Sequence, residues 1–223
     1  MTTPGRTGLF LDLDGTLADS VPVLRRVYRR FLEHFGYEGN DVEFDRLNGP
    51  KLPEIIAILK TAYRLEMAAG ELLDLYDCLV DQAYTEVMPY PNSLEAVASA
   101  CERGWVVTVV TSNLGGRTKA WLERNRFSSY VAGVVSGEEV TRGKPWPDLY
   151  DLAQARAATT RSLSLAIEDS LSGIQAAQAA GLRAIMFVTD QTQVSVLPAD
   201  VERMSNWSEL SRFLVGASVI SEK

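Results

Sequence analysis

Hydrophobic residues follow two different spacings along this chain. Between about residues 20 and 85 they recur at steps of three and four, as in Leu24 and Val27, which is the spacing of one helix face. From Tyr90 onward, short apolar runs alternate with helical segments. The first part therefore predicts packed helices, and the second part predicts repeated strand–helix units.

The second part predicts an α/β protein with a doubly wound, mainly parallel sheet. The run 105–110 is continuous and largely β-branched, which suits a strand buried on both faces. Asn92, with Glu95 three residues later, predicts a capping box at a helix start. Gly181 is placed where a helix end needs positive φ. Further strands are expected at 131–135, 164–167 and 183–188, and helices at 117–125, 148–158 and 171–180.

The helices that follow the first strand predict a smaller second lobe. The first of them covers about 21–35 and ends at Gly36, and two more cover 52–65 and 71–85. Glycine-containing segments separate the three. The chain must leave the sheet near Asp19 and return at 87–91, so these segments are the expected hinges. The expected division is an α/β core of residues 1–18 and 88–223 and a helical cap of residues 19–87.

Asp12 and Asp14 follow the first apolar run, with Gly15 and Thr16 directly after them. Two carboxylates two residues apart at a strand end point the same way, so they can share a divalent cation or divide nucleophilic and acid/base work. Gly15 permits a sharp turn that brings backbone N–H groups close to a ligand. Taken alone, the segment is equally compatible with a strand that ends in a polar turn.

Other strand ends also carry polar groups. The run 105–110 leads into Thr111, Ser112 and Asn113, which offer hydroxyls, an amide and a helix start to phosphate oxygens, although such residues are also ordinary helix caps. Lys144 lies between Gly143 and Pro145, and it is either a fixed ammonium of the site or a surface lysine.

A second acidic pair, Glu168 and Asp169, ends the strand predicted at 164–167. Ligands of parallel sheets gather where the carboxyl ends of the strands meet, so both acidic pairs are expected at one edge. Carboxylate-rich oxygen sites favour Mg²⁺. The joint occurrence of these groups favours a phosphate and metal site over the separate structural interpretations.

In this combination the chain resembles the haloacid dehalogenase-like phosphotransferase superfamily, over nearly its whole length. The insert of helices after the first motif is similar to the small cap of phosphoglycolate phosphatase-like and β-phosphoglucomutase-like members. The segments that carry the resemblance are Asp12-Leu13-Asp14-Gly15-Thr16 with Asp19-Ser20, Val110-Thr111-Ser112-Asn113, Gly143-Lys144-Pro145 and Glu168-Asp169-Ser170-Leu171-Ser172-Gly173.

The resemblance implies a role for each acidic residue. Asp12 would be the nucleophile that forms an aspartyl-phosphate, and Asp14 would protonate the leaving alcohol and then deprotonate water. Asp169 would bind Mg²⁺ together with Asp12 and the main-chain oxygen of Asp14, with Glu168 acting directly or through a metal-bound water. Because dehalogenases of the superfamily lack the second aspartate, Asp14 argues against carbon–halogen hydrolysis.

The resemblance also implies which residues bind phosphate and substrate. Phosphate would contact Gly15, Thr16, Thr111, Ser112, Asn113 and Lys144, with Lys144 offsetting the negative charge of the transition state. The cap would close over the cleft and recognise the leaving group. Arg46, Asn48 and Lys51 are the candidate residues for that contact.

The resulting hypothesis is a Mg²⁺-dependent phosphomonoester hydrolase that acts on a small metabolite such as phosphoglycolate or a sugar phosphate. A β-phosphoglucomutase-like phosphomutase would use the same core residues and stays open as an alternative. A binding or regulatory protein that has lost catalysis is a third hypothesis, against which the complete set of site residues argues.

Charge and composition narrow the class of partner. The chain of 223 residues has a formal net charge of −7, which argues against general nucleic-acid binding. Its sequence predicts neither a membrane span nor a signal peptide, so a cytoplasmic protein is expected. Cys78 and Cys101 have no metal-site or redox spacing and are expected to be reduced thiols, and His34 is expected to be a packing or boundary residue. No protein partner is indicated.

Overall fold

Parallel strands form one sheet in the computed structural model, which describes residues 5–47, 49–190 and 201–218, the last four by their backbone only. The strand order is β3-β2-β1-β4-β5-β6, and every pairing is parallel. The predicted doubly wound α/β fold is confirmed. The strands are β1 (Gly8–Leu11), β2 (Val106–Val110), β3 (Gly133–Val135), β4 (Leu165–Glu168), β5 (Arg183–Phe187) and β6 (Glu202–Met204).

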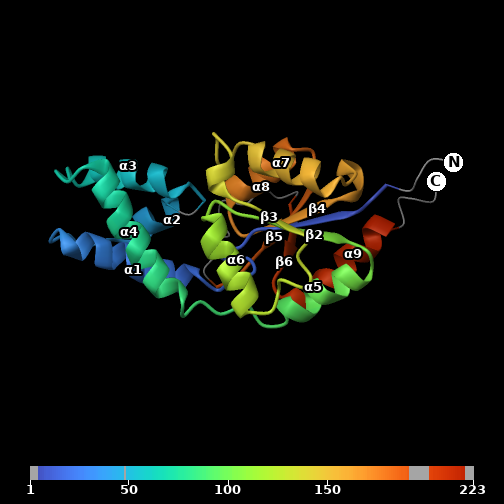
Figure 1. Cartoon of the computed structure of the whole chain (residues 1–223). Coiled ribbons are helices and arrows are strands. Elements are labelled where there is room, and N and C mark those ends of the chain that lie inside the picture. Colours follow the sequence, from blue (N-terminus) through green and yellow to red (C-terminus); the bar gives the residue numbers. More distant parts are fainter. Residues whose placement is uncertain (1–4, 48, 191–200, 219–223) are drawn as a thin grey trace.

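Helices cover both faces of the sheet (Figure 1). Side chains alternate along β1, so Leu9 and Leu11 join the core on one face and Phe10 joins the core on the other. The first face is covered by α5 (Ser93–Glu102), α6 (Gly115–Arg124) and α9 (Leu210–Ser218), and the second by α7 (Asp148–Ala157) and α8 (Leu171–Ala179).

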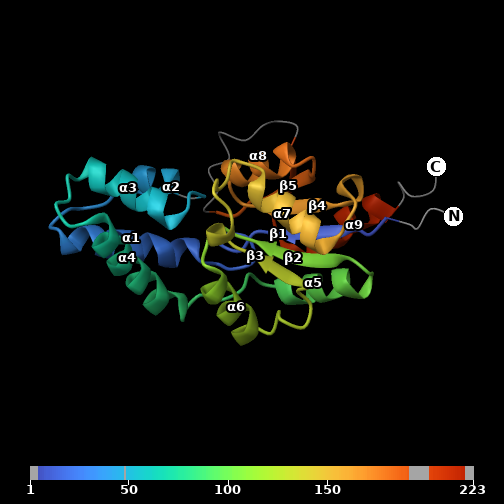
Figure 2. The same ribbon diagram turned by 45° about the horizontal axis from the view of Figure 1, so that its top comes forward.

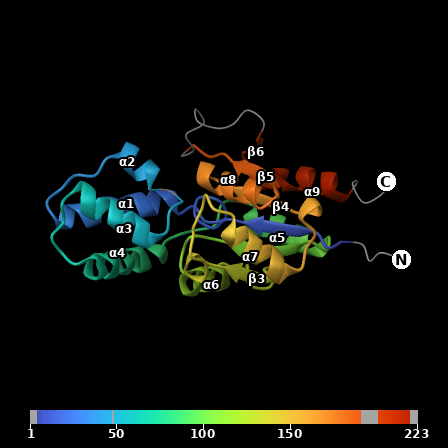
Figure 3. The same cartoon turned by 90° about the horizontal axis from the view of Figure 1, so that it is seen from above.

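The helices that follow β1 pack on each other beside the sheet, at one end of the molecule (Figures 2 and 3). Their buried interior includes Tyr28, Phe31 and Tyr76. The entering and leaving segments are hydrogen-bonded to each other, since the Asp19 N–H donates to the Met88 oxygen at 2.9 Å. These helices are α1 (Val21–His34), α2 (Asp41–Arg46), α3 (Leu52–Ala62) and α4 (Ala69–Tyr84).

One local prediction is wrong. Asn92 does precede α5, but its φ is +63° and its side chain makes no capping hydrogen bond, so it does not form the predicted capping box with Glu95. A side-chain cap on the first-turn amides needs an extended backbone at the capping residue. The positive φ predicted for Gly181 is confirmed at +75°.

The remaining expectations concern the two cysteines, the histidine and membrane-spanning segments. Cys78 and Cys101 are free thiols, and His34 is the last residue of α1. Within the described ranges, no helix combines the length and the hydrophobicity needed to cross a bilayer. β6 and α9 lie beyond the last strand that the sequence pattern predicted.

Candidate active site

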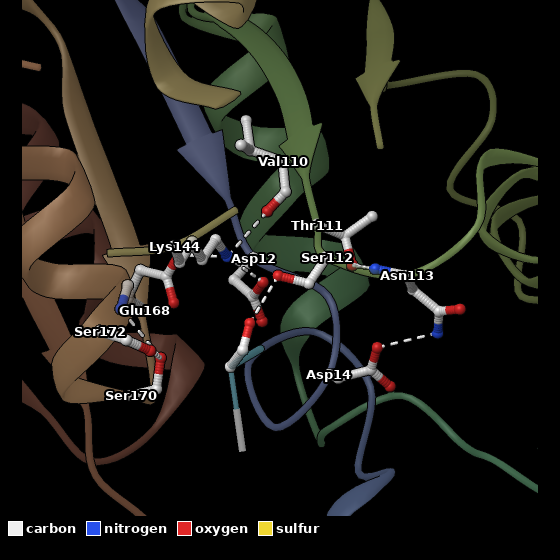
Figure 4. Close-up of polar contacts among 12 residues, drawn as sticks. Asp12, Asp14, Val110, Thr111, Ser112, Asn113, Lys144, Glu168, Ser170 and Ser172 are labelled. Carbon is white, nitrogen blue, oxygen red and sulfur yellow. Dashed lines mark hydrogen bonds and ion pairs between the residues drawn. The ribbon is translucent and has the colours of Figure 1, made fainter. Parts of the chain in front are cut away.

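The carboxyl ends of β1, β2 and β4 lie side by side and bring the predicted site residues together (Figure 4). Leu11 on β1 is in register with Val109 on β2 and with Ile167 on β4. The residues that follow therefore leave the sheet at one edge. Asp12 follows β1 there, and Glu168 ends β4.

Asp12 and Lys144 form a buried ion pair at the centre of this edge. Lys144 Nζ lies 2.5 Å from Asp12 Oδ1 and also donates to the Val110 oxygen at 3.2 Å. Burial alone would lower the pKa of Lys144, but the charges of Asp12 and Glu168 raise it above its ordinary value. Burial raises the pKa of Asp12; Lys144 opposes that rise, and Glu168 and Asp169 add to it.

Three carboxylates converge beside Lys144. Asp12, Glu168 and Asp169 each offer an oxygen within 4.8 Å of the others. Glu168 Oε1 accepts from Lys144 and Tyr150, whereas its buried Oε2 has no hydrogen-bond partner in the described part of the chain. Three carboxylates against one ammonium, with a buried oxygen left over, fit a hard divalent cation such as Mg²⁺.

Gly15 packs directly against this acidic cluster. Its φ is +83°, and a Cβ atom there would lie 2.1 Å from Asp169 Oδ2, so only glycine lets the turn approach the carboxylate so closely. Thr16 is fully buried, and its Oγ1 has no hydrogen-bond partner among the described residues. Neither residue lines the pocket that lies between this edge of the sheet and the helices α1 to α4.

Asp14 faces the same edge and accepts hydrogen bonds through both carboxylate oxygens. Tyr84 donates its hydroxyl to Oδ1 at 2.8 Å, and the Asn113 amide donates to Oδ2 at 2.9 Å. Arg117 in turn donates to Asn113 Oδ1 at 2.8 Å. The orientation of the Asn113 amide is therefore determined by Arg117, and Asp14 is held from two sides.

Tyr84 and Arg117 are absent from the sequence-based prediction. Arg117 is 7% exposed and pairs with Asp77 at 2.6 Å and with Asp81 at 2.7 Å, so it ties α6 to the cap helix α4. The spacing of Asp77, Asp81 and Tyr84 does place them on one helix face. That spacing does not identify the partner, because Arg117 lies on a different element.

Thr111 and Ser112 line the pocket at the end of β2. Thr111 Oγ1 accepts from the Asn113 N–H at 3.0 Å, which holds the turn that leads towards α6. Ser112 donates its hydroxyl to the Gly49 oxygen at 2.7 Å. Ser112 therefore joins the core to the segment between α2 and α3.

The three candidate cap-loop residues are placed differently from the core residues. Arg46 is exposed, and it is not among the residues that line the pocket. Lys51 also lies outside this lining and donates to the main-chain oxygens of Val140 at 3.1 Å and Thr141 at 2.9 Å. Asn48 lies outside the described residues.

A pocket with about 120 Å³ open to water-sized molecules lies between this edge of the sheet and the helices α1 to α4. Its cap side is formed largely by apolar side chains from α1 to α4. The residues on its core side are Asp12, Asp14, Thr111, Ser112, Asn113, Arg117, Lys144, Asp169 and Ser170.

A family model for haloacid dehalogenase-like hydrolases matches residues 9–187 of the chain, which include both acidic pairs and Lys144. The chain belongs to this family. The predicted class, a haloacid dehalogenase-like phosphatase, is confirmed. The buried cluster of Asp12, Glu168 and Asp169 is consistent with the Mg²⁺ site of the family.

Characterised relatives of the chain differ in the ester they are named for. The phosphoglycolate phosphatase of Rhodobacter capsulatus is 29% identical, over 85% of this chain and 89% of the relative. The fructose-1-phosphate phosphatase YqaB of Escherichia coli is 27% identical, over 80% and 94%. CbbY from Rhodobacter sphaeroides, solved in complex with phosphate, superposes with a TM-score of 0.80 at 23% identity, over 92% and 96%, and shares the fold.

Proposed function

We propose that this chain hydrolyses phosphate monoesters of small metabolites through an aspartyl-phosphate on Asp12. The observation that carries the proposal is the buried edge where Asp12 contacts Lys144 at 2.5 Å, while Asp14, two residues later, faces the same pocket. A carboxylate nucleophile and a second carboxyl group for proton transfer are the two protein groups that such a reaction needs.

The proposed reaction has two halves. A carboxylate oxygen of Asp12 attacks phosphorus, the bond from phosphorus to the alcohol oxygen breaks, and protonated Asp14 gives its proton to that oxygen. Asp14, now ionised, then removes a proton from water as the water attacks the phosphoaspartate. Phosphate leaves, and both aspartates return to their starting states. The hydrogen bonds from Tyr84 and Asn113 orient Asp14 for both transfers.

We assign the binding of the phosphoryl group to the residues around Lys144. The Lys144 ammonium is buried and cationic, so it offsets the charge that the phosphoryl oxygens carry in the transition state. Thr111, Ser112 and Asn113 line the same pocket and offer hydroxyl and amide groups. Gly15 and Thr16 remain candidates for phosphate contact; their own N–H groups donate to the oxygens of Ala18 at 2.9 Å and Leu13 at 3.2 Å and shape the turn after β1.

Mg²⁺ is the proposed cofactor. Asp12 and Asp169 would hold it with the main-chain oxygen of Asp14, and Glu168 would support it directly or through water. When bound, the ion supplies positive charge that draws the phosphate towards Asp12 and balances the carboxylates.

We further propose that residues 19–87 act as a cap on the core formed by residues 1–18 and 88–223. The cap helices supply one wall of the pocket, and Tyr84 reaches Asp14 from the end of α4. Closure of such a lobe excludes water and completes the site around the substrate. Arg46, Asn48 and Lys51 remain candidates for contact with the leaving group in that closed state.

A panel of phosphate esters tests the proposal. Purified protein with Mg²⁺ is expected to release inorganic phosphate from p-nitrophenyl phosphate and from at least one metabolite ester, with phosphoglycolate and fructose 1-phosphate tested first. Asp12→Asn is the matched control, because it keeps the size of the side chain and removes the nucleophile. Full activity of this variant would contradict the assignment of Asp12.

Glucose 1-phosphate distinguishes hydrolysis from the mutase alternative. A phosphatase releases phosphate and glucose, whereas a mutase returns the phosphoryl group to the sugar and forms glucose 6-phosphate. Formation of glucose 6-phosphate without phosphate release would replace the hydrolase assignment. Failure to turn over any ester of the panel would favour the non-catalytic binding protein instead.

A further inference from the structure

The wall of the pocket that faces the catalytic edge is apolar. Leu24, Leu52 and Ile55 are only partly buried, so they expose hydrocarbon surface, and they line the pocket. Among the described cap residues of this wall, Tyr76 supplies the only polar side-chain atom. The cap wall consists of Leu24, Phe44, Leu47, Gly49, Pro50, Leu52, Ile55, Tyr76 and Val80.

Arg117, one of the two cationic residues that line the pocket, already binds protein groups. Arg117 donates through Nε to Asp81, through Nη1 to Asn113, and through Nη2 to Asp77. All three of its nitrogen atoms are therefore engaged, and two carboxylates balance its charge. Arg117 joins α6 to α4, and four of its five N–H groups already donate to protein oxygens. A substrate can add at most one hydrogen bond to Arg117 without displacing one of these partners.

Other polar groups near the cap wall are engaged in the same way. Ser112 donates its hydroxyl to the Gly49 oxygen, and Lys51 donates to two main-chain oxygens outside the pocket lining. A polyol or carboxylate placed against such a wall loses hydrogen bonds to water and gains few in return. A hydrocarbon group placed there loses nothing and removes apolar surface from water.

We infer that the alcohol portion of the preferred substrate is a hydrocarbon group, so that the enzyme selects small alkyl or aryl phosphates over phosphoglycolate and sugar phosphates. The inference rests on the proposed phosphatase function for the position of the phosphoryl group. The phosphoryl group lies at Asp12 and Lys144, and the hydrocarbon group extends towards Leu52 and Ile55 on α3.

Binding of non-hydrolysable n-alkylphosphonates tests this inference without turnover. Calorimetry with Mg²⁺ present, over the series from methylphosphonate to n-pentylphosphonate, is expected to show Kd falling by roughly two- to fourfold for each added methylene. In turnover, n-butyl phosphate is expected to exceed erythritol 4-phosphate, which has the same number of carbons, by about tenfold in kcat/KM.

Two isoleucines of α3 provide a matched pair of variants. Ile55 lines the pocket, whereas Ile58 on the same helix is 45% exposed and is not in the lining. Ile55→Asn is expected to remove most of the dependence on chain length, and Ile58→Asn is expected to keep it. Leu52→Ala, which shortens another side chain of the wall, gives an independent measurement should Ile55→Asn not fold.

The binding and turnover measurements test the apolar specificity of the pocket and the phosphatase activity separately. Affinity that does not change along the alkyl series, or a preference for erythritol 4-phosphate, would overturn the apolar specificity while the phosphatase stands. Tighter binding along the series without phosphate release from any ester would support the apolar pocket and overturn the phosphatase. An equal loss in Ile55→Asn and Ile58→Asn would overturn the assignment of the wall to α3.

Discussion

The catalytic edge of the sheet and the cap wall opposite it are held by different forces. At the edge, Asp12, Glu168 and Lys144 are fixed by ion pairs of 2.5 Å at the ends of strands in register. On the cap wall, side chains such as Leu52 and Ile55 are held by packing against other apolar groups. Under the proposed function, this difference places the chemistry in the core and allows changes in the cap to alter substrate preference without altering the reacting groups.

The largest expected effect is a loss of kcat when the proposed nucleophile is replaced. Asp12→Asn is expected to lower kcat by at least about 1000-fold, because loss of a covalent nucleophile leaves only binding and electrostatic contributions. Phosphate release measured with p-nitrophenyl phosphate checks this value. Binding of n-butylphosphonate should persist in the variant, since the cap wall is unchanged, and loss of that binding would contradict the division between edge and wall.

Removal of divalent cation is expected to have an effect of similar size. Chelation should abolish turnover and Mg²⁺ should restore it, because Asp12, Glu168 and Asp169 converge within 4.8 Å. Added Mg²⁺ should also stabilise the folded protein by about 2.7 kcal/mol at a concentration near 100 times Kd, and so raise its Tm. Asp169→Asn is expected to lose this response in calorimetry. An unchanged response would exclude Asp169 as a ligand.

Lys144→Met probes how far the stability of the edge depends on one cation. Removal of the ammonium leaves buried carboxylates without their partner, and an unfolding free energy lower by about 3 kcal/mol is expected. Urea denaturation without Mg²⁺ measures the loss. Addition of Mg²⁺ should recover part of it, because both cations balance the same carboxylates.

Tyr84→Phe tests the hydrogen bond that reaches Asp14 from the cap. Its removal is expected to lower kcat by about three- to tenfold, in line with about 1 kcal/mol for one such bond, with little change in KM. Tyr63→Phe is the matched control, because Tyr63 also donates to a carboxylate, that of Glu43, but within the cap at 2.5 Å. A similar fall in kcat for both variants would indicate a structural effect of the cap.

The smallest effect is expected from Lys51→Ala. This residue donates to two main-chain oxygens of the core and does not line the pocket, so its loss should change KM by about twofold as the cap is held less firmly. Turnover of p-nitrophenyl phosphate should be retained. A change of substrate preference in steady-state kinetics would instead place Lys51 in contact with the leaving group.

Much of the core was predictable because its signals are local. The β-branched run before Thr111 and the acidic pairs at the carboxyl ends of β1 and β4 each identify a strand end without knowledge of the rest of the fold. Parallel pairing then requires those ends to meet at one edge. The capping box predicted at Asn92 is absent because that residue adopts positive φ. The spacing of Asn92 and Glu95 in the sequence does not reveal this backbone conformation.

The surroundings of Asp14 were not predictable in this way. Tyr84 reaches it across 70 residues of sequence and Asn113 across 99, and Arg117 joins α6 to α4. Contacts of this kind depend on how the helices that follow β1 are placed against the sheet and its covering helices. No periodicity within either segment encodes that placement.

The sequence by itself determined which polar and acidic residues lie at the strand ends and the edge of the sheet where they gather, because strand period and parallel pairing are properties of short segments. Only the tertiary structure decided what faces those groups: an apolar wall from α3 and neighbouring cap helices, and an arginine already engaged by Asp77 and Asp81. The physical reason is that a hydrophobic residue in a helix pattern can fill a core or line a pocket equally well, and packing between distant segments selects one of the two.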